Sequence, residues 1–226
     1  MERVQQYCKI LSEQLVKDSP YSHLIDKKFI ENIINASPLH DIGKVGISDN
    51  ILLKQGQLSE DEFEKIKKHT IIGYETLKEV HSKFGANSFI EMGMTMALCH
   101  HERFDGSGYP YHMKGEKIDI YARYMAIVDT YTAMASPRTY RNAFTPLQIL
   151  GNYEDNIEKY DITLLLPLMK KIANSQIGTT VQLSDDTVWE VLMVNENKYS
   201  RPILKNNENQ FLDLSKRTDL FIVKNV

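Results

Sequence analysis

Apolar residues recur every three or four positions through the first 175 residues of the chain. At its start, Val4, Cys8 and Leu11 begin one apolar stripe among polar neighbours. Residues three and four apart lie on the same face of a helix, so this spacing predicts amphipathic helices. The expected helices cover residues 4–16, 26–36, 59–80, 88–101, 119–135, 146–156 and 161–175.

The longest expected helix, 59–80, begins at Ser59. Serine is a typical N-cap, and the acidic residues that follow it suit the first turn of a helix. The apolar or small residues expected along its inward face are Phe63, Ile66, Thr70, Gly73 and Leu77.

The pattern changes near residue 176, where short runs rich in β-branched and aromatic residues are separated by turn-prone segments. The expected strands lie within residues 179–184, 187–194, 201–205 and 210–215. We therefore predict a mainly α protein, with a helical domain over residues 1–175 and a small C-terminal antiparallel β appendage over 176–226.

Composition narrows the classes of function. The chain is 42% hydrophobic and 25% charged, as ordinary globular domains are, and its formal net charge is −3. That charge gives no overall attraction to duplex nucleic acid or to an anionic membrane, so an anionic substrate needs local cations. We expect no membrane insertion, since no apolar run reaches about 18 residues. The polar first residues do not resemble a signal peptide, and the separated cysteines, Cys8 and Cys99, favour a reduced, cytoplasmic setting.

Several ionisable residues interrupt these apolar segments. Histidine and aspartate are costly to bury without a partner. Two pairs are adjacent in sequence, one at the end of an apolar segment and one at the end of a nearly all-apolar helix. Two further residues stand singly on expected helices. The six are His40, Asp41, His69, His100, His101 and Asp129.

Imidazole and carboxylate are the usual ligands of zinc, iron and manganese. Consecutive helical residues point roughly 100° apart, so an adjacent pair does not easily serve one tetrahedral ion. The pairs favour two ions and a bridging carboxylate, and ions about 3.5–4 Å apart are typical of in-line displacement at phosphorus. The alternative is ordinary hydrogen-bonded histidines, which is how we interpret His23, His81 and His112. A ferritin-like di-iron bundle needs Glu-x-x-His, which none of the seven histidines provides.

The segments that carry these residues resemble the HD-GYP family of metal-dependent phosphodiesterases, a branch of the HD superfamily. The resemblance covers roughly residues 3–175, and it implies an HD-type helical bundle. Its motifs are HDIGKV (40–45), ILLKQGQLSEDEFEKIKKHT (51–70), HHERFDGSGYP (100–110), VDTYTAMAS (128–136) and RTYR (138–141).

The resemblance implies hydrolysis of cyclic di-GMP to pGpG and, in some members, to GMP. It implies that the six histidines and aspartates bind two divalent transition metal ions, iron or manganese with zinc as an alternative. Asp41 bridges the ions, and a hydroxide held between them attacks phosphorus. Lys44, one turn after the HD pair, stabilises charge on the phosphoryl oxygens or assists the leaving oxygen.

The resemblance also implies roles around the metal ions. Arg138 and Arg141 bind phosphates or guanine edges of the substrate, and Glu102 orients a ligand histidine. The loop that gives the family its name leans over the site or faces a partner, such as a diguanylate cyclase (GGDEF) domain. Its residues are Gly106, Gly108, Tyr109 and Pro110.

Three departures from the family pattern bear on activity. The family's upstream Glu-x-x-x-His would fall immediately before Met1, so we expect two ions, one weakly held. Thr132 stands where the family commonly has aspartate, and a neutral hydroxyl cannot replace a carboxylate as proton carrier or lysine partner. Pro38 deletes a helix hydrogen bond and should kink the segment that carries the HD pair.

The leading hypothesis is therefore a cyclic di-GMP phosphodiesterase that forms the output part of a longer signalling protein, downstream of a sensor or receiver domain. A hydrolase of another cyclic dinucleotide is the alternative within the enzyme class. The third hypothesis is a degenerate module that binds metal and nucleotide, or a protein partner, without turnover.

Overall fold

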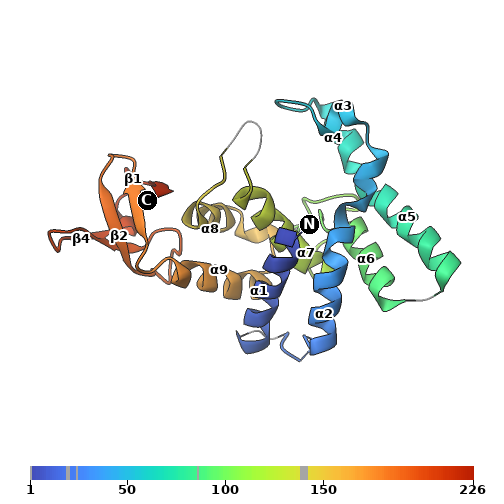
Figure 1. Cartoon of the computed structure of the whole chain (residues 1–226), viewed down its shortest axis with the longest axis horizontal. Helices are drawn as coiled ribbons and strands as arrows, with labels where there is room; N and C mark the ends of the chain where they lie inside the picture. The colour runs from blue at the N-terminus through green and yellow to red at the C-terminus, as the bar shows by residue number, and fades with distance from the viewer. Residues whose placement is uncertain (1, 19–20, 24, 86, 138–141) are drawn as a thin grey trace. The chain divides into compact units, whose positions relative to one another are not determined.

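The computed structural model describes residues 2–18, 21–23, 25–85, 87–137 and 142–226 (Figure 1). The chain divides into two compact units. The first comprises Met1–Ala133 and Glu158–Leu165, and the second comprises Met134–Ile157 and Leu166–Val226. The expected domain boundary at residue 175 stays a prediction.

The fold class is confirmed: helices dominate, and a small antiparallel sheet follows them (Figure 1). Among the described helices, none is long and apolar enough to cross a membrane. The helices are α1 (Glu2–Asp18), α2 (Lys27–Ala36), α3 (Asp49–Leu52), α4 (Glu60–Lys67), α5 (His69–Phe84), α6 (Ser88–Cys99), α7 (Ile120–Ala135), α8 (Pro146–Asp155) and α9 (Ile162–Ser175). The 3₁₀ segments are η1 (Ser37–Gly46), η2 (Gly115–Lys117), η3 (Ile157–Lys159) and η4 (Leu214–Lys216).

The prediction of one helix over 59–80 is wrong, because α4 ends at Lys67 and α5 begins at His69. Side chains at the start of α5 take the last carbonyls of α4. The His69 Nδ1 donates to the Ile66 carbonyl at 2.6 Å. The Thr70 hydroxyl donates to the Lys67 carbonyl at 2.9 Å. Polar side chains thus break the helix without glycine or proline.

The break also changes which residues of this segment are buried. Phe63 on α4 is 45% exposed, so it does not belong to the inward face expected for it. Thr70, Gly73 and Leu77 are buried on α5 as expected.

The core of the first unit lies between α1, α2, α6 and α7. Leu11, Ile33 and Met96 are fully buried there. On α7 the buried Tyr124 hydroxyl lies 2.7 Å from the Ser12 hydroxyl of α1, so a polar contact is satisfied inside an apolar core. The segment η1 packs against both α5 and α6. This packing brings the HD pair to the histidines of those helices.

At Pro38 the chain changes helix type, and the expected kink stays a prediction. The α-helix ends at Ala36, and η1 follows directly as a 3₁₀ helix. Pro38 has no N–H to donate to the Ile34 carbonyl. The Ser37 hydroxyl donates to that carbonyl instead, at 2.9 Å. Long 3₁₀ runs are uncommon and often mark functional segments.

The sheet of the second unit is antiparallel, with strand order β4-β3-β2-β1-β5. Val181, Val191 and Leu204 are buried on one face. The four expected strands are confirmed, whereas the fifth was not predicted. The strands are β1 (Thr180–Leu183), β2 (Val188–Met193), β3 (Ile203–Lys205), β4 (Phe211–Asp213) and β5 (Ile222–Asn225).

Candidate metal centre

Three imidazoles converge on the Asp41 carboxylate. The His40 Nε2 lies 3.3 Å from Asp41 Oδ2. The Nε2 atoms of His69 and His100 lie 3.5 and 3.8 Å from Asp41 Oδ1. The histidines are buried, and they come from η1, the start of α5 and the residue after α6. The sequence predicted this meeting of distant segments from the two adjacent pairs.

Backbone contacts fix the tautomer of each ring. In His40, His69 and His100, Nδ1 lies 2.5, 2.6 and 2.8 Å from a carbonyl oxygen three or four residues earlier in the chain. A carbonyl only accepts, so each Nδ1 carries the proton. The Nε2 atom of a neutral ring is then an unprotonated acceptor.

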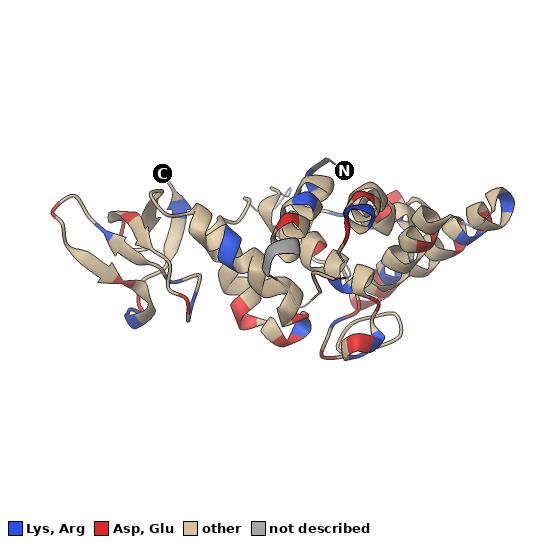
Figure 2. Cartoon of the chain, turned by 90° about the horizontal axis from the view of Figure 1, so that it is seen from below, with Lys and Arg blue, Asp and Glu red and all other residues tan. Residues whose placement is uncertain are grey.

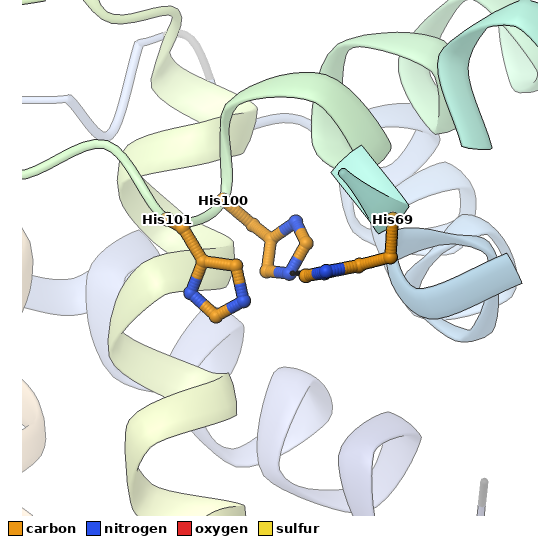
Figure 3. A group of neighbouring side chains, drawn as sticks. All are labelled: His69, His100 and His101. Atoms are coloured by element: carbon orange, nitrogen blue, oxygen red, sulfur yellow. Dashed lines mark hydrogen bonds between the residues drawn. The ribbon is translucent and has the colours of Figure 1, made fainter. Parts of the chain in front are cut away.

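At this centre, hydrogen-bond acceptor atoms therefore face one another with no donor between them. Burial lowers the pKa of His69 and, more strongly, of His100, so both rings stay neutral. Their Nε2 atoms lie 3.4 Å apart, joined by the dashed line in Figure 3, and both face the carboxylate. Among the described residues, the buried Asp41 Oδ1 has no hydrogen-bond partner. A cation satisfies all three atoms at once, so these residues fit a metal ion.

The pKa of His40 shifts in the direction opposite to those of His69 and His100. Burial lowers its pKa, but hydrogen bonds with Asp129 and Asp41 outweigh that effect and raise the pKa to about 10. The Asp129 Oδ1 lies 3.7 Å from His40 Nε2. The His40 contacts hold the pKa of both carboxyls well below its usual range, against their burial. A proton on Nε2 thus occupies a position where a metal ion would also meet these ligands.

Five of the six predicted ligands fall into two groups that could each hold an ion. In each group the potential ligand atoms lie within 4.8 Å of one another, and His100 belongs to both groups. The first group comprises His69, His100 and His101, whose rings Figure 3 shows gathered together; the second comprises His40, Asp41 and His100. Asp129, the sixth, is beside His40. Each group therefore offers three ligand atoms to a metal ion, and the expected number of two ions stays a prediction.

The other residues predicted to act at the site are a lysine, a threonine and two arginines. The Lys44 ammonium donates to Asp41 Oδ2 at 2.5 Å, so it faces the same carboxylate as the histidines. The Thr132 hydroxyl donates to the Val128 carbonyl of its own helix at 2.8 Å. Arg138 and Arg141 lie outside the described residues.

The loop after α6 folds back over its own start. The Tyr109 N–H donates to the His101 carbonyl at 3.2 Å, and the Tyr109 ring stacks on the His101 ring with centroids 4.7 Å apart. A Cβ on Gly108 would lie 2.3 Å from the Arg103 nitrogen, so only glycine fits this approach. Gly106 has a φ of +88°, and Pro110 follows Tyr109. The loop therefore leans over the histidine cluster.

The role expected of Glu102 requires correction. Its two carboxylate oxygens accept the backbone N–H groups of Tyr111 and Met113, at 2.7 and 3.0 Å. A buried carboxylate needs such donors, and here the loop supplies them. Glu102 therefore anchors the loop and does not orient a ligand histidine. The rings of His40, His69 and His100 are oriented by backbone carbonyls instead.

Two glycines that the sequence analysis did not assign set the spacing of the centre. A Cβ on Gly43 would lie 1.9 Å from the His69 carbonyl oxygen and 2.4 Å from the Gly73 nitrogen. The backbones of η1 and α5 thus touch directly between Asp41 and His69. Glycine inside an apolar helical pattern was the available signal, because it marks close backbone approach.

Fold and site together define the class of protein. A family model of the HD domain matches residues 4–164, which is more than half of the chain, and the chain belongs to this family. The match confirms the family expected from the sequence. Membership implies divalent metal binding, and the described histidine and aspartate groups are positioned to hold such ions.

Curated relatives give more particular likenesses. The chain is 43% identical over 143 residues to a cyclic di-GMP phosphodiesterase of Vibrio cholerae serotype O1, covering 63% of this chain and 29% of that protein. It is 41% identical over 145 residues to the cyclic di-GMP phosphodiesterase response regulator RpfG of Xanthomonas campestris pv. campestris, covering 64% and 35%. It is 35% identical over 149 residues to the 3′3′-cGAMP-specific phosphodiesterase 2 of Vibrio cholerae, covering 66% and 26%. The aligned part is thus between 26% and 35% of each relative's length.

Proposed function

We propose that this chain is a metal-dependent phosphodiesterase domain that hydrolyses cyclic di-GMP to the linear dinucleotide pGpG, with GMP as a further product. One observation carries the proposal: neutral Nε2 atoms of His69 and His100 face the buried, unpaired Asp41 Oδ1. Such a ligand set suits two transition metal ions, iron or manganese with zinc as the alternative. When bound, the ions lower the pKa of a coordinated water and polarise the phosphoryl oxygens.

The side chains of the site then have separate roles. His40, His69, His100, His101 and Asp129 hold the cations, and Asp41 contacts both groups through its two oxygens. The Lys44 ammonium, 2.5 Å from Asp41 Oδ2, is placed to meet negative charge on the phosphoryl oxygens or to protonate the leaving oxygen. Hydrolysis adds a water oxygen to phosphorus and releases a ribose hydroxyl, which opens the ring of the cyclic dinucleotide.

The names of the relatives favour cyclic di-GMP as substrate. Relatives named cyclic di-GMP phosphodiesterase range from 29% to 46% identity, whereas the 3′3′-cGAMP-specific relatives reach at most 35%. Hydrolysis of another cyclic dinucleotide is the alternative. A cytoplasmic setting, an upstream sensor or receiver domain and contact with a diguanylate cyclase through the loop stay predictions.

A second candidate function is a degenerate module that binds metal and nucleotide without turnover. Thr132 supports it, because its hydroxyl donates to the Val128 carbonyl and offers no carboxylate to a proton or to a lysine. The two candidates share the metal centre and differ only in chemistry.

One experiment separates these candidates. The chain is loaded with Mn²⁺ or Fe²⁺ and incubated with cyclic di-GMP and 3′3′-cGAMP, and the products are followed by chromatography. We expect pGpG from cyclic di-GMP, and no product from the Asp41→Ala variant. Nucleotide binding without product would select the degenerate module. Absence of metal binding by the wild-type chain would reject both.

A further inference from the structure

A groove opens beside the histidine cluster, and several of its lining residues have no role in the metal centre described above. Its volume is about 260 Å³, far above the roughly 30 Å³ that one water occupies in the liquid. His101 and Tyr109 form one wall, and the remaining walls come from α4, from the loop after α6 and from the end of η3. A ligand group bound at His101 could therefore extend into it.

The charged residues lining the groove are cationic. Lys67, Arg103 and Lys159 line it, and no aspartate or glutamate is among its described lining residues. Lys67 also pairs with Glu64 at 2.5 Å, but that carboxylate is largely exposed, and such surface pairs hold a lysine only weakly. Figure 2 shows acidic and basic residues interspersed along the helices. A local group of three cations is thus a distinctive feature in a chain of net charge −3.

Arg103 is a partly buried cation that lines the groove. Its Nη1 is buried and has no hydrogen-bond partner among the described residues. An orphaned buried donor is rare in native proteins and destabilises the fold, so it calls for a partner. The Arg103 guanidinium also lies over the Tyr160 ring, 5.5 Å from its centre. This contact gives the guanidinium N–H groups no hydrogen-bond acceptor in their own plane.

Aromatic rings accompany these cations. Phe63 and Tyr109 both line the groove, with ring centroids 6.4 Å apart in an edge-to-face arrangement. The Lys67 ammonium lies 4.8 and 5.4 Å from the centres of these two rings. Phe63 is 45% exposed, so part of its ring is accessible from the groove side of α4. Exposed rings beside cations are typical of surfaces that stack nucleobases.

We propose that this groove, lined by Phe63, Lys67, Arg103, Tyr109 and Lys159, is a nucleotide subsite that binds a phosphate together with its attached base. The inference rests on the proposed function, because it assigns the groove to the part of the cyclic dinucleotide that is not being cut. Arg103 and Lys67 hold the phosphate, and Phe63 stacks on the base. The groove acts in binding and does not touch the reacting atoms.

The test compares neutral variants with matched controls on the metal-loaded chain. Arg103→Gln and Lys67→Gln each remove one groove cation, whereas Lys65→Gln removes an equal charge from the exposed side of α4. Phe63→Ala removes the stacking ring, and Phe84→Ala removes a ring that is 83% exposed on α5. The measurements are KM and kcat for cyclic di-GMP, and the Kd of GMP by calorimetry.

We expect Arg103→Gln to raise KM and the Kd of GMP by roughly ten- to a hundredfold, because a charged hydrogen bond is lost. Phe63→Ala should raise both by about five- to a hundredfold. kcat should change by less than about threefold, and the controls should match the wild type. Without ligand, Arg103→Gln should lower the melting temperature by no more than about 4 °C, since the contact that it loses is the one with the Tyr160 ring.

Failure of each proposal gives a different result. If the wild type hydrolyses cyclic di-GMP but the groove variants keep the KM of their controls, the subsite is wrong and the function stands. If the wild type hydrolyses no cyclic dinucleotide but Arg103→Gln still weakens GMP binding tenfold, the subsite stands and the function is wrong. A melting temperature lowered by more than about 4 °C with unchanged GMP binding would assign Arg103 a structural role and overturn the subsite.

Discussion

Replacement of Gly43 by alanine should pull the metal centre apart while adding a single methyl group. Gly43 lies in η1, and its φ is outside the left-handed region, so alanine can adopt its backbone conformation. The added Cβ would lie 1.9 Å from the His69 carbonyl oxygen and 2.4 Å from the Gly73 nitrogen. Both are backbone atoms of α5, so neither can rotate away. The strain must be relieved by moving η1 away from α5.

The size of this movement follows from the contact distance. Real Cβ atoms essentially never approach other heavy atoms within 3.0 Å, so a contact of 1.9 Å must lengthen by at least 1.1 Å. Asp41 and His40 move with η1, whereas His69 stays with α5. Metal ligands must keep their distances within about 0.2 Å. A displacement five times larger should weaken metal affinity by at least the roughly 10- to 100-fold seen when supporting contacts are lost.

The free energy of unfolding of Gly43→Ala should fall as well, although overpacking elsewhere in the interior would have the same effect on it. Overpacking of a close-packed interior typically costs about 1–3 kcal/mol. The control is Gly151→Ala on α8, where the new Cβ would meet the Ser200 Cβ at 3.5 Å, an ordinary contact. Alanine in that helix interior should stabilise the fold by up to about 1 kcal/mol.

Two measurements check this prediction. Urea denaturation of the metal-free chain gives the free energy of unfolding, and Mn²⁺ titration by calorimetry gives the affinity. Gly43→Ala should lose both stability and affinity, whereas Gly151→Ala should keep the affinity of the wild type. If Gly43→Ala binds Mn²⁺ within twofold of the wild type, close backbone contact does not set the ligand spacing and the reasoning fails.

Three further outcomes follow from the structure. Mn²⁺ at a hundred times its Kd should stabilise the wild type by about 2.7 kcal/mol in thermal unfolding; Asp41→Asn should lose most of this gain, and an equal gain would remove Asp41 from the centre. Glu102→Gln should lower the free energy of unfolding in urea by roughly 1–3 kcal/mol, since an amide group then faces backbone N–H donors; no change would refute its role as loop anchor. Burial raises the pKa of Cys8 and Cys99 to about 12, so Ellman's reagent should modify them roughly a thousandfold more slowly than a free thiol at pH 8. The labelling rate should rise tenfold per pH unit while the fold holds, and rapid labelling in the native state would contradict this.

The sequence was most informative where one local pattern decides the structure. Apolar spacing was sufficient for α1, α2, α6 and α7, because each buries a single stripe. It was insufficient at α4 and α5, where the His69 and Thr70 side chains take the carbonyls of the preceding helix. That competition depends on side-chain direction, which periodicity does not contain.

Contacts between residues far apart in the chain were the second reason why the structure differs from the prediction made from the sequence. β5 pairs with β1, which lies some forty residues earlier in the chain, with Leu183 opposite Ile222. Its short apolar run shows no alternation over a longer stretch, so pattern alone did not mark it as a strand. Likewise, the adjacent pairs identified the histidines of the centre, but the backbone contact at Gly43 appears only when η1 meets α5.

The two orphaned atoms next to the histidines have opposite electrostatic needs. The Asp41 Oδ1, 3.8 Å from His100 Nε2, lacks a donor, and the Arg103 Nη1, two residues beyond His101, lacks an acceptor. The Arg123 Nε is also buried without a hydrogen-bond partner among the described residues, although the Arg123 Nη1 pairs with Asp161 at 2.6 Å. A cation at Asp41 would give Oδ1 the partner that it lacks, as the proposed metal centre requires, and a phosphate in the groove would meet the positive charge of Arg103, as the proposed subsite requires.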